Sequence, residues 1–171
     1  DVVFVSGSVG DAGAGLALLR GDAPSLGVAD SAALIARYRT PTPRLALGRA
    51  LRGLASACLD VSDGLLADLG HIGEVSKVRL VIEAVKIPLS SPVRALWGVT
   101  GDGIVRAATA GDDYELAFTA PPSARAGIAE AAKGAGIAVH EIGRVEAGTG
   151  VDMVGANGQR IAVEQGGYRH F

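Results

Sequence analysis

Aromatic side chains and cysteine are scarce in this sequence. Aromatic residues make up 4% of the 171 residues, and Cys58 is the only cysteine. An internal disulfide is therefore excluded, and the apolar run around Cys58 predicts a buried, unreactive thiol. The core has to be built from Ala, Val, Leu and Ile, and the 25 glycines predict many turns.

The sequence also lacks a long apolar run and a strong excess of either charge. No apolar stretch reaches the roughly 18 residues that a membrane span requires, no signal-peptide pattern is found, and the net charge is −2. A hydrophobic content of 49% with 20% charged residues predicts a sizeable folded core. We therefore expect a cytoplasmic protein of one domain that binds neither membranes nor nucleic acid.

The common nucleotide and zinc motifs are absent as well. The sequence has no Walker A loop, no GxGxxG after a strand, no HExxH and no CxxC. Those designs are excluded, whereas a nucleotide enzyme of another design remains open.

The periodicity predicts an α+β fold, in which helices pack on a mixed β-sheet. Strands are expected at residues 2–5, 78–83, 114–119 and 138–145, and Asn157-Gly158 predicts a hairpin between residues 151–154 and 160–163. Helices are expected at residues 11–19, 30–38, 44–54, 64–76 and 123–133, with one more short helix around Trp97. Asp11 and Asp30 are the expected N-caps of the first two helices.

Residues 59–66, LDVSDGLL, place two carboxylates and a hydroxyl where a strand gives way to a helix. Asp60, Ser62 and Asp63 offer the oxygen ligands that Mg²⁺ prefers, beside helix N–H groups of the kind that bind phosphate. A simpler interpretation makes Asp63 or Ser62 the N-cap of the helix and Asp60 a solvated strand end. The octapeptide alone leaves both interpretations open.

A second acidic cluster, GDDYEL, occupies residues 111–116. Asp112 and Asp113 are also typical of ordinary turns, because Asp and Gly favour turns for backbone reasons. If the fold brings this turn next to Asp60 and Asp63, the joint site would repel anions unless a divalent cation is bound. Such a site suits Mg²⁺-dependent phosphoryl transfer, in which the protein positions groups and neutralises charge.

Other polar residues have competing interpretations. Tyr168, in the Gly-rich tail, either fills the core or stacks on a ligand. Arg37, Arg39 and Arg44 surround a Pro-rich connector, where they pair with phosphate or acidic neighbours or are simply solvated. His71 is expected at the surface.

A series of short strings runs along the whole chain in a fixed order. They are VSGSVGDAGAGLALL, RYRTPTPRLALGRAL, ASACLDVSDGLLADLGHI, AGDDYELAFTAPP, IGRV and the terminal GGYRHF. With these strings the chain resembles the C-terminal domain of the thiamine-monophosphate kinase family, within the superfamily of aminoimidazole ribonucleotide synthetase and selenophosphate synthetase. GDDYEL, GGYRHF and RYRTPTPR point to the kinase family over its superfamily relatives.

The resemblance implies transfer of the γ-phosphate of ATP onto thiamine monophosphate, giving thiamine diphosphate, with several Mg²⁺ ions and a monovalent cation such as K⁺. By position, Asp60 and Asp63 match metal-binding aspartates, and Ser62 matches a serine that contacts the nucleotide. Asp112 matches a substrate-binding acid, and Tyr168 matches an aromatic residue that contacts thiamine. No catalytic base or nucleophile is implied, because the acceptor is already an ionised phosphate.

The sequence departs from the family pattern near the substrate residues. Arg169 stands where the family usually has Asp, and Ala110 stands where a second Gly is common. In the family, an N-terminal domain supplies most of the Mg²⁺ and ATP-phosphate ligands and much of the dimer interface. Since Asp1 begins within a strand pattern, we expect residues 1–171 to be a single C-terminal domain of a longer, homodimeric kinase, inactive without the N-terminal domain.

Two other functions stay open on the sequence. One is another ATP-dependent enzyme of the same superfamily. The other is a non-catalytic module whose acidic turns bind only a cation or another ligand.

Overall fold

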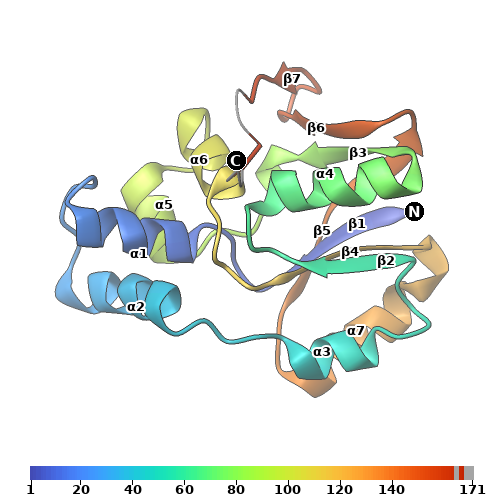
Figure 1. Cartoon of the computed structure of the whole chain (residues 1–171), viewed down its shortest axis with the longest axis horizontal. Helices are drawn as coiled ribbons and strands as arrows, with labels where there is room; N and C mark the ends of the chain where they lie inside the picture. Colours follow the sequence, from blue (N-terminus) through green and yellow to red (C-terminus); the bar gives the residue numbers. More distant parts are fainter. Residues whose placement is uncertain (164–165, 168–171) are drawn as a thin grey trace.

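The computed structural model describes residues 1–163 and 166–167 of the chain. They form a seven-stranded sheet with the strand order β2-β4-β1-β5-β3-β6-β7 (Figure 1). Its strands are β1 (Val2–Ser6), β2 (Ala57–Asp60), β3 (Val78–Glu83), β4 (Leu116–Ala120), β5 (Val139–Ala147), β6 (Gly150–Val154) and β7 (Arg160–Ile161). β3 and β6 are parallel, and the other neighbours are antiparallel. The predicted mixed sheet is therefore confirmed, and so is the hairpin between β6 and β7.

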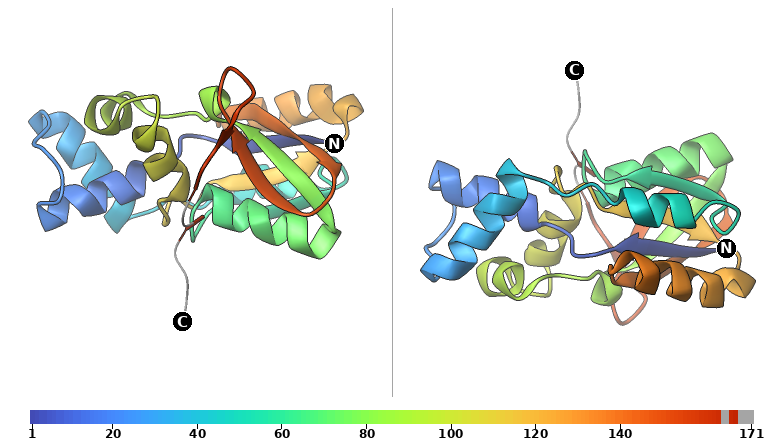
Figure 2. Two further views of the ribbon diagram at one scale, coloured as in Figure 1. Left: turned by 90° about the horizontal axis from the view of Figure 1, so that it is seen from above. Right: turned by 90° about the horizontal axis from the view of Figure 1, so that it is seen from below.

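Helices cover both faces of the sheet and one of its ends. Helix α4 (Leu65–Ser76) lies on one face, and α3 (Leu45–Ala50) and α7 (Arg125–Ala135) lie on the other (Figure 2). A second group gathers beyond one end of the sheet: α1 (Asp11–Arg20), α2 (Val28–Arg39), α5 (Ser91–Trp97) and α6 (Asp102–Thr109). Short 3-10 turns occupy Ala84–Lys86 and Pro122–Ala124. In the described part of the chain, no helix has the length and apolar character needed to cross a bilayer.

Strand β1 packs on both layers of helices, and all its residues are buried. Val3 and Val5 belong to the apolar cluster beneath α4, whereas Val2 and Phe4 belong to the cluster with α3 and α7. Phe4 stacks on Phe118 with ring centroids 5.2 Å apart. A continuous apolar run such as residues 2–5 is what a strand buried on both faces requires, because successive side chains point to opposite faces.

The pairing of β2 with β4 sets the position of both acidic segments. The two strands are antiparallel, with Asp60 opposite Leu116, so β2 ends where β4 begins. The loop that follows β2 and the turn that precedes β4 therefore leave the sheet at the same place.

The expected N-caps of the first two helices were wrong. Gly10 and Gly27 occupy the N-cap positions, and Asp11 and Asp30 lie in the first turns of α1 and α2. An acid in the first turn is still favourable there, because it interacts with the positive end of the helix dipole.

Two helical segments also differ from the prediction in length or number. Helix α3 ends at Ala50, short of the expected residue 54, and Gly53 follows with φ 76°. Two helices, α5 and α6, stand where one short helix was expected. Gly98 and Gly101 separate them with φ values of 81° and 55°, which glycine adopts at little cost.

The expectation of a buried cysteine was wrong. Cys58 is exposed, because β2 is an edge strand and Cys58 lines an open cavity beside α3. Partial desolvation and the negative charge of nearby Asp60 raise the pKa of the thiol. Little of it is therefore in the reactive thiolate form at neutral pH.

Candidate functional site

The two acidic segments lie side by side. The backbone N–H of Asp112 donates to the carbonyl of Ser62 at 2.9 Å, and the N–H of Tyr114 donates to the carbonyl of Val61 at 2.8 Å. The N–H of Val61 in turn donates to the carbonyl of Glu115 at 2.8 Å. These bonds hold the loop after β2 and the turn before β4 in one register, a proximity that spacing along the chain could not establish.

Glycine permits this close approach at two positions. A Cβ on Gly111 would lie 2.4 Å from the carbonyl oxygen of Ser62, and one on Gly64 would lie 2.7 Å from the carbonyl oxygen of Thr109. Gly64 also has φ 122° and is the N-cap of α4, with no side chain capping the helix. The alternative interpretation of Ser62 or Asp63 as the N-cap of this helix was therefore wrong.

A cavity of about 410 Å³ opens between the two segments. Among the described residues, its lining is Gly13, Leu16, Ser62, Asp63, Ala110, Gly111, Asp112 and Tyr114. Asp63 and Asp112 are both partly exposed, and no lysine or arginine belongs to this described lining. The lining thus holds two carboxylates, whose oxygen atoms are the ligands that a hard divalent cation takes.

Asp60 does not line this cavity. It is exposed at the end of β2 and lines a separate cavity of about 510 Å³, together with Arg44 and Arg49. Tyr114 lines both cavities. Of the residues proposed from the sequence, Ser62, Asp63 and Asp112 thus share one cavity, and Asp60 lines its neighbour.

Asp68 shapes the loop and was missed by the sequence analysis. Its Oδ2 atom accepts hydrogen bonds from the backbone N–H groups of Ser62, Asp63 and Gly64 at 2.9, 3.1 and 3.1 Å. Burial raises the pKa of this carboxyl, although the three N–H donors oppose that effect. Its position on the apolar face of α4, between Leu65 and Ile72, was the available signal.

Asp63 also belongs to a group of three possible metal ligands. The ligand atoms of Asp63, Asp68 and His71 all lie within 4.8 Å of one another. His71 is exposed on α4, as expected. The residues around Asp63 therefore offer both carboxylate oxygen and imidazole nitrogen to a cation.

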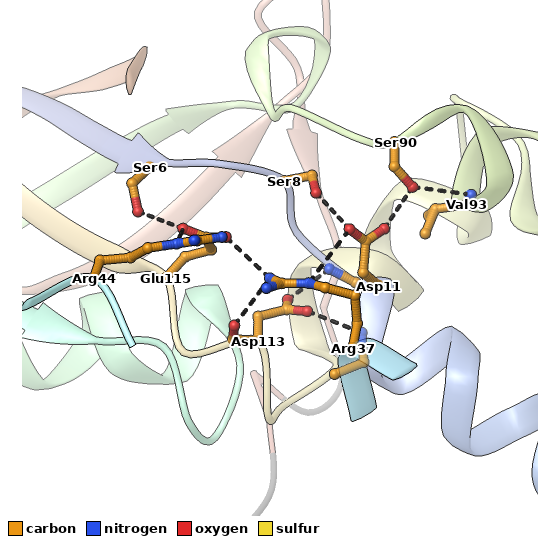
Figure 3. Close-up of polar contacts among 11 residues, drawn as sticks. Ser6, Ser8, Asp11, Arg37, Arg44, Ser90, Val93, Asp113 and Glu115 are labelled. Atoms are coloured by element: carbon orange, nitrogen blue, oxygen red, sulfur yellow. Dashed lines mark hydrogen bonds and ion pairs between the residues drawn. The ribbon is translucent and has the colours of Figure 1, made fainter. Parts of the chain in front are cut away.

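Asp113, the second acid of the turn, points away from the cavity and into the protein. Its side chain is 1% exposed and accepts hydrogen bonds from the N–H of Gly10 at 2.6 Å and of Ala12 at 3.1 Å (Figure 3). Burial raises the pKa of this carboxyl to about 7. Asp113 thereby supplies the cap that α1 does not obtain from its own residues.

The turn ends at a buried charge cluster around Glu115. Glu115 is fully buried and contacts Arg37, Arg44 and Ser6 (Figure 3). Of the three connector arginines, Arg37 and Arg44 therefore pair with an acid, and Arg39 is exposed. Hydrogen bonding to Glu115 raises the pKa of Arg44, which stays charged.

Tyr168 lies outside the described residues. Gly167, which precedes it in the sequence, lies against the start of α4: a Cβ there would be 2.3 Å from the carbonyl oxygen of Asp63 and 2.7 Å from the Cβ of Ala67. Gly167 is thus packed on the loop that carries Asp63, and Gly166 lies near Leu66 and Ala67 in the first turn of α4.

This architecture has known relatives. The family model described as AIR synthase related protein, C-terminal domain, matches residues 1–155. The chain belongs to this family. Two solved structures have the same fold over most of this chain, with TM-scores of 0.81 and 0.80.

The resemblance to thiamine-monophosphate kinases is confirmed. The enzyme of Escherichia coli K12 is 34% identical over 183 residues, covering 100% of this chain and 52% of the relative. A crystal structure of thiamine-monophosphate kinase from Stenotrophomonas maltophilia K279a has a TM-score of 0.81 at 40% identity, covering 90% of this chain and 49% of that one. AaThiL complexed with AMPPCP and TMP has a TM-score of 0.80 at 35% identity, covering 100% of this chain and 51% of that one. The chain spans about half the length of these relatives.

Proposed function

We propose that this chain is the C-terminal half of a thiamine-monophosphate kinase, which transfers the γ-phosphoryl group of ATP to thiamine monophosphate. The cavity that Asp63 and Asp112 share supports this proposal most directly. A cavity that presents two carboxylates suits a reaction between two anionic substrates when cations neutralise the charge, as in Mg²⁺-dependent phosphoryl transfer. The similarity to AaThiL complexed with AMPPCP and TMP agrees with the same reaction.

Each residue has a role in this proposal. Asp60 and Asp63 would hold Mg²⁺, with Asp68 keeping the Asp63 loop in shape through its three hydrogen bonds. Ser62 would contact the nucleotide, and Asp112 and Tyr168 would bind the thiamine phosphate. Mg²⁺, when bound, neutralises the charge of the phosphate oxygens and screens the two substrates from each other.

The chemical step requires little more than alignment. An oxygen of the acceptor phosphate forms a bond to the γ-phosphorus, the bond from that phosphorus to the β,γ-bridging oxygen breaks, and ADP leaves. The acceptor oxygen is already ionised, so no residue has to remove a proton. The contribution of Ser62, Asp63 and Asp112 is then to bind and orient the reactants across one cavity.

The rest of the site would come from outside these residues. We propose an N-terminal domain that supplies the remaining Mg²⁺ and ATP-phosphate ligands, K⁺ as a further cation, and a homodimer as the complete enzyme. A cytoplasmic location, expected from the sequence, fits an enzyme that consumes ATP.

The test is a direct assay of both forms of the protein. The full-length protein is expected to convert thiamine monophosphate to thiamine diphosphate in the presence of ATP and Mg²⁺. The 171-residue chain alone is expected to show no conversion. Chromatography of the products measures the conversion in both cases. A full-length protein that makes ADP only with a different phosphate acceptor would overturn the proposed substrate. Conversion by the 171-residue chain alone would overturn the dependence on a second domain.

A further inference from the structure

The arginines on either side of the Pro-rich connector between α2 and α3 have no role in the proposed reaction, yet two of them reach the acidic turn. Arg37 comes from the last turn of α2, and Arg44 directly precedes α3. Both side chains converge on Glu115, the residue that ends the turn (Figure 3). The side chains of Arg37 and Arg44 are only 21% and 14% exposed, so these are largely buried contacts.

Glu115 is held from several sides. Arg44 donates to it twice, from Nε at 2.8 Å and from Nη2 at 2.6 Å. Ser6 donates its hydroxyl proton at 2.6 Å, and Arg37 donates from Nη2 at 3.0 Å. Paired donation by a planar guanidinium fixes the orientation of a carboxylate as well as its position.

Arg37 makes two contacts that Arg44 does not. The same Nη2 atom of Arg37 donates to the backbone carbonyl of Asp113 at 3.1 Å. Arg37 therefore connects the buried carboxylate of Glu115 to the backbone of the turn itself. Its Nε also lies 3.9 Å from the carboxylate of Asp11, which keeps the guanidinium between three acidic residues.

The turn needs such support because its backbone is unfavourable. Asp112 has φ 68° and Tyr114 has φ 51°, which lie in the left-handed region of the backbone. Residues other than glycine rarely adopt this region. Conformations of this kind persist only where the surroundings hold them. Arg37 binds the carbonyl of Asp113, the residue between these two.

We propose that Arg37 is a positioning residue that holds the turn at residues 111–115 in the conformation that presents Asp112 to the cavity. This inference rests on the proposed function, in which Asp112 binds the thiamine-phosphate acceptor. Arg37 does not line that cavity, so it acts through the backbone of the turn. Its loss weakens the binding of the acceptor and leaves ATP binding nearly unchanged.

The test compares Arg37→Met, Arg37→Lys and Arg39→Met in the full-length protein. Met keeps the apolar part of the side chain, Lys restores a charged donor, and Arg39 is an exposed arginine of the same helix. Hydrogen–deuterium exchange measures the turn directly, and steady-state kinetics measures KM for thiamine monophosphate and for ATP separately.

For Arg37→Met we expect about tenfold faster exchange at residues 111–115, with β1 unchanged, and about tenfold higher KM for thiamine monophosphate with an ATP KM within about twofold. Arg37→Lys should recover part of both effects, and Arg39→Met should match the unmodified protein. Unchanged exchange and KM in Arg37→Met would overturn the proposal. So would faster exchange throughout the sheet or equal changes in both KM values, since these indicate a general structural role.

Two further results would also decide between these roles of Arg37. Should Arg37→Met not fold, Arg37→Lys decides, because a single ammonium group is expected to replace the guanidinium contacts only in part. A selective rise in the KM for thiamine monophosphate then supports the proposal, and no selective rise overturns it. If the unmodified full-length protein does not phosphorylate thiamine monophosphate, the proposed function fails, whereas the exchange of residues 111–115 still decides the role of Arg37.

Discussion

The carboxylate of Asp113 accepts a 2.6 Å hydrogen bond from the N–H of Gly10, 103 positions earlier in the chain. A residue of the acidic turn therefore caps helix α1. Its neighbour Asp112 lines the cavity instead. The two adjacent acids therefore have separate roles: Asp113 belongs to the framework, and Asp112 belongs to the candidate site. Substitutions at the two positions should separate stability from activity.

We expect Asp113→Asn to lower the free energy of unfolding by about 1–3 kcal/mol, because one of the two helix N–H groups would lose its acceptor in a buried position. Asp112→Asn is the matched control. Asp112 is partly exposed, so its replacement should change stability by no more than about 0.5 kcal/mol. Urea unfolding followed by circular dichroism measures both. Equal effects of the two substitutions would contradict the assignment of the cap.

The same carboxyl should make stability depend on pH. Burial raises the pKa of Asp113 from 3.8 to about 7, although the N–H groups of Gly10 and Ala12 and the charge of Arg37 act in the other direction. Between these two values the folded state holds a proton that the unfolded chain has released. The contribution of this group to the free energy of unfolding is therefore fully present at low pH and decreases as pH rises from about 4 to about 7.

Unfolding in urea at pH 5, 6 and 7.5 would measure this effect. The free energy of unfolding of the unmodified chain, minus that of Asp113→Asn, should decrease across the series. A difference that stays constant with pH would show that Asp113 is ionised throughout, and an increase would equally contradict a raised pKa.

In the full-length protein we expect Asp63→Asn to reduce kcat by about a hundredfold or more without unfolding the protein, because a metal ligand loses its charge. Raising the Mg²⁺ concentration should recover part of the activity. Asp22→Asn, at an exposed aspartate outside the cavity lining, is the control and should leave kcat unchanged. Near-normal turnover of Asp63→Asn would remove Asp63 from the metal site.

Gly111→Ala should disturb the contact between the two acidic segments. Its Cβ would lie 2.4 Å from the carbonyl oxygen of Ser62, a backbone atom that cannot move alone. We expect a loss of about 1–3 kcal/mol in the free energy of unfolding and weaker substrate binding. Gly134→Ala provides the contrast: it lies in α7 with open space around it, and should stabilise the chain by about 0.5–1 kcal/mol. Equal thermal unfolding temperatures for the two variants would contradict the tight contact at Gly111.

The sequence predicted the elements whose signal is local. The alternation in residues 78–83 and the Asn157-Gly158 turn correspond to β3 and to the β6–β7 hairpin. Helix starts were less predictable, because the cap of α1 comes from Asp113 and not from Asp11 nearby. A cap supplied across 103 positions leaves no pattern within a window of one helix.

The candidate site was predictable in its residues but not in its arrangement. Ser62, Asp63 and Asp112 were found from their motifs, whereas their convergence depends on the register of β2 with β4. The buried role of Glu115 was not predictable, since a glutamate whose arginine partners lie 71 and 78 positions away reads as an ordinary solvated charge. Asp68 did carry a signal, as a lone acid on an otherwise apolar helix face.

The place of β1 in the middle of the sheet has a consequence for the order of folding. Both neighbours of β1, the strands β4 and β5, lie more than 100 positions later in the chain. Contacts at such large sequence separation form slowly, because the entropy cost of closing a long loop comes before the contacts can stabilise the structure. During synthesis, residues 2–6 cannot pair with either of these neighbours until residues 116–120 have left the ribosome. We expect this apolar segment to be the part of the nascent chain that most depends on chaperones.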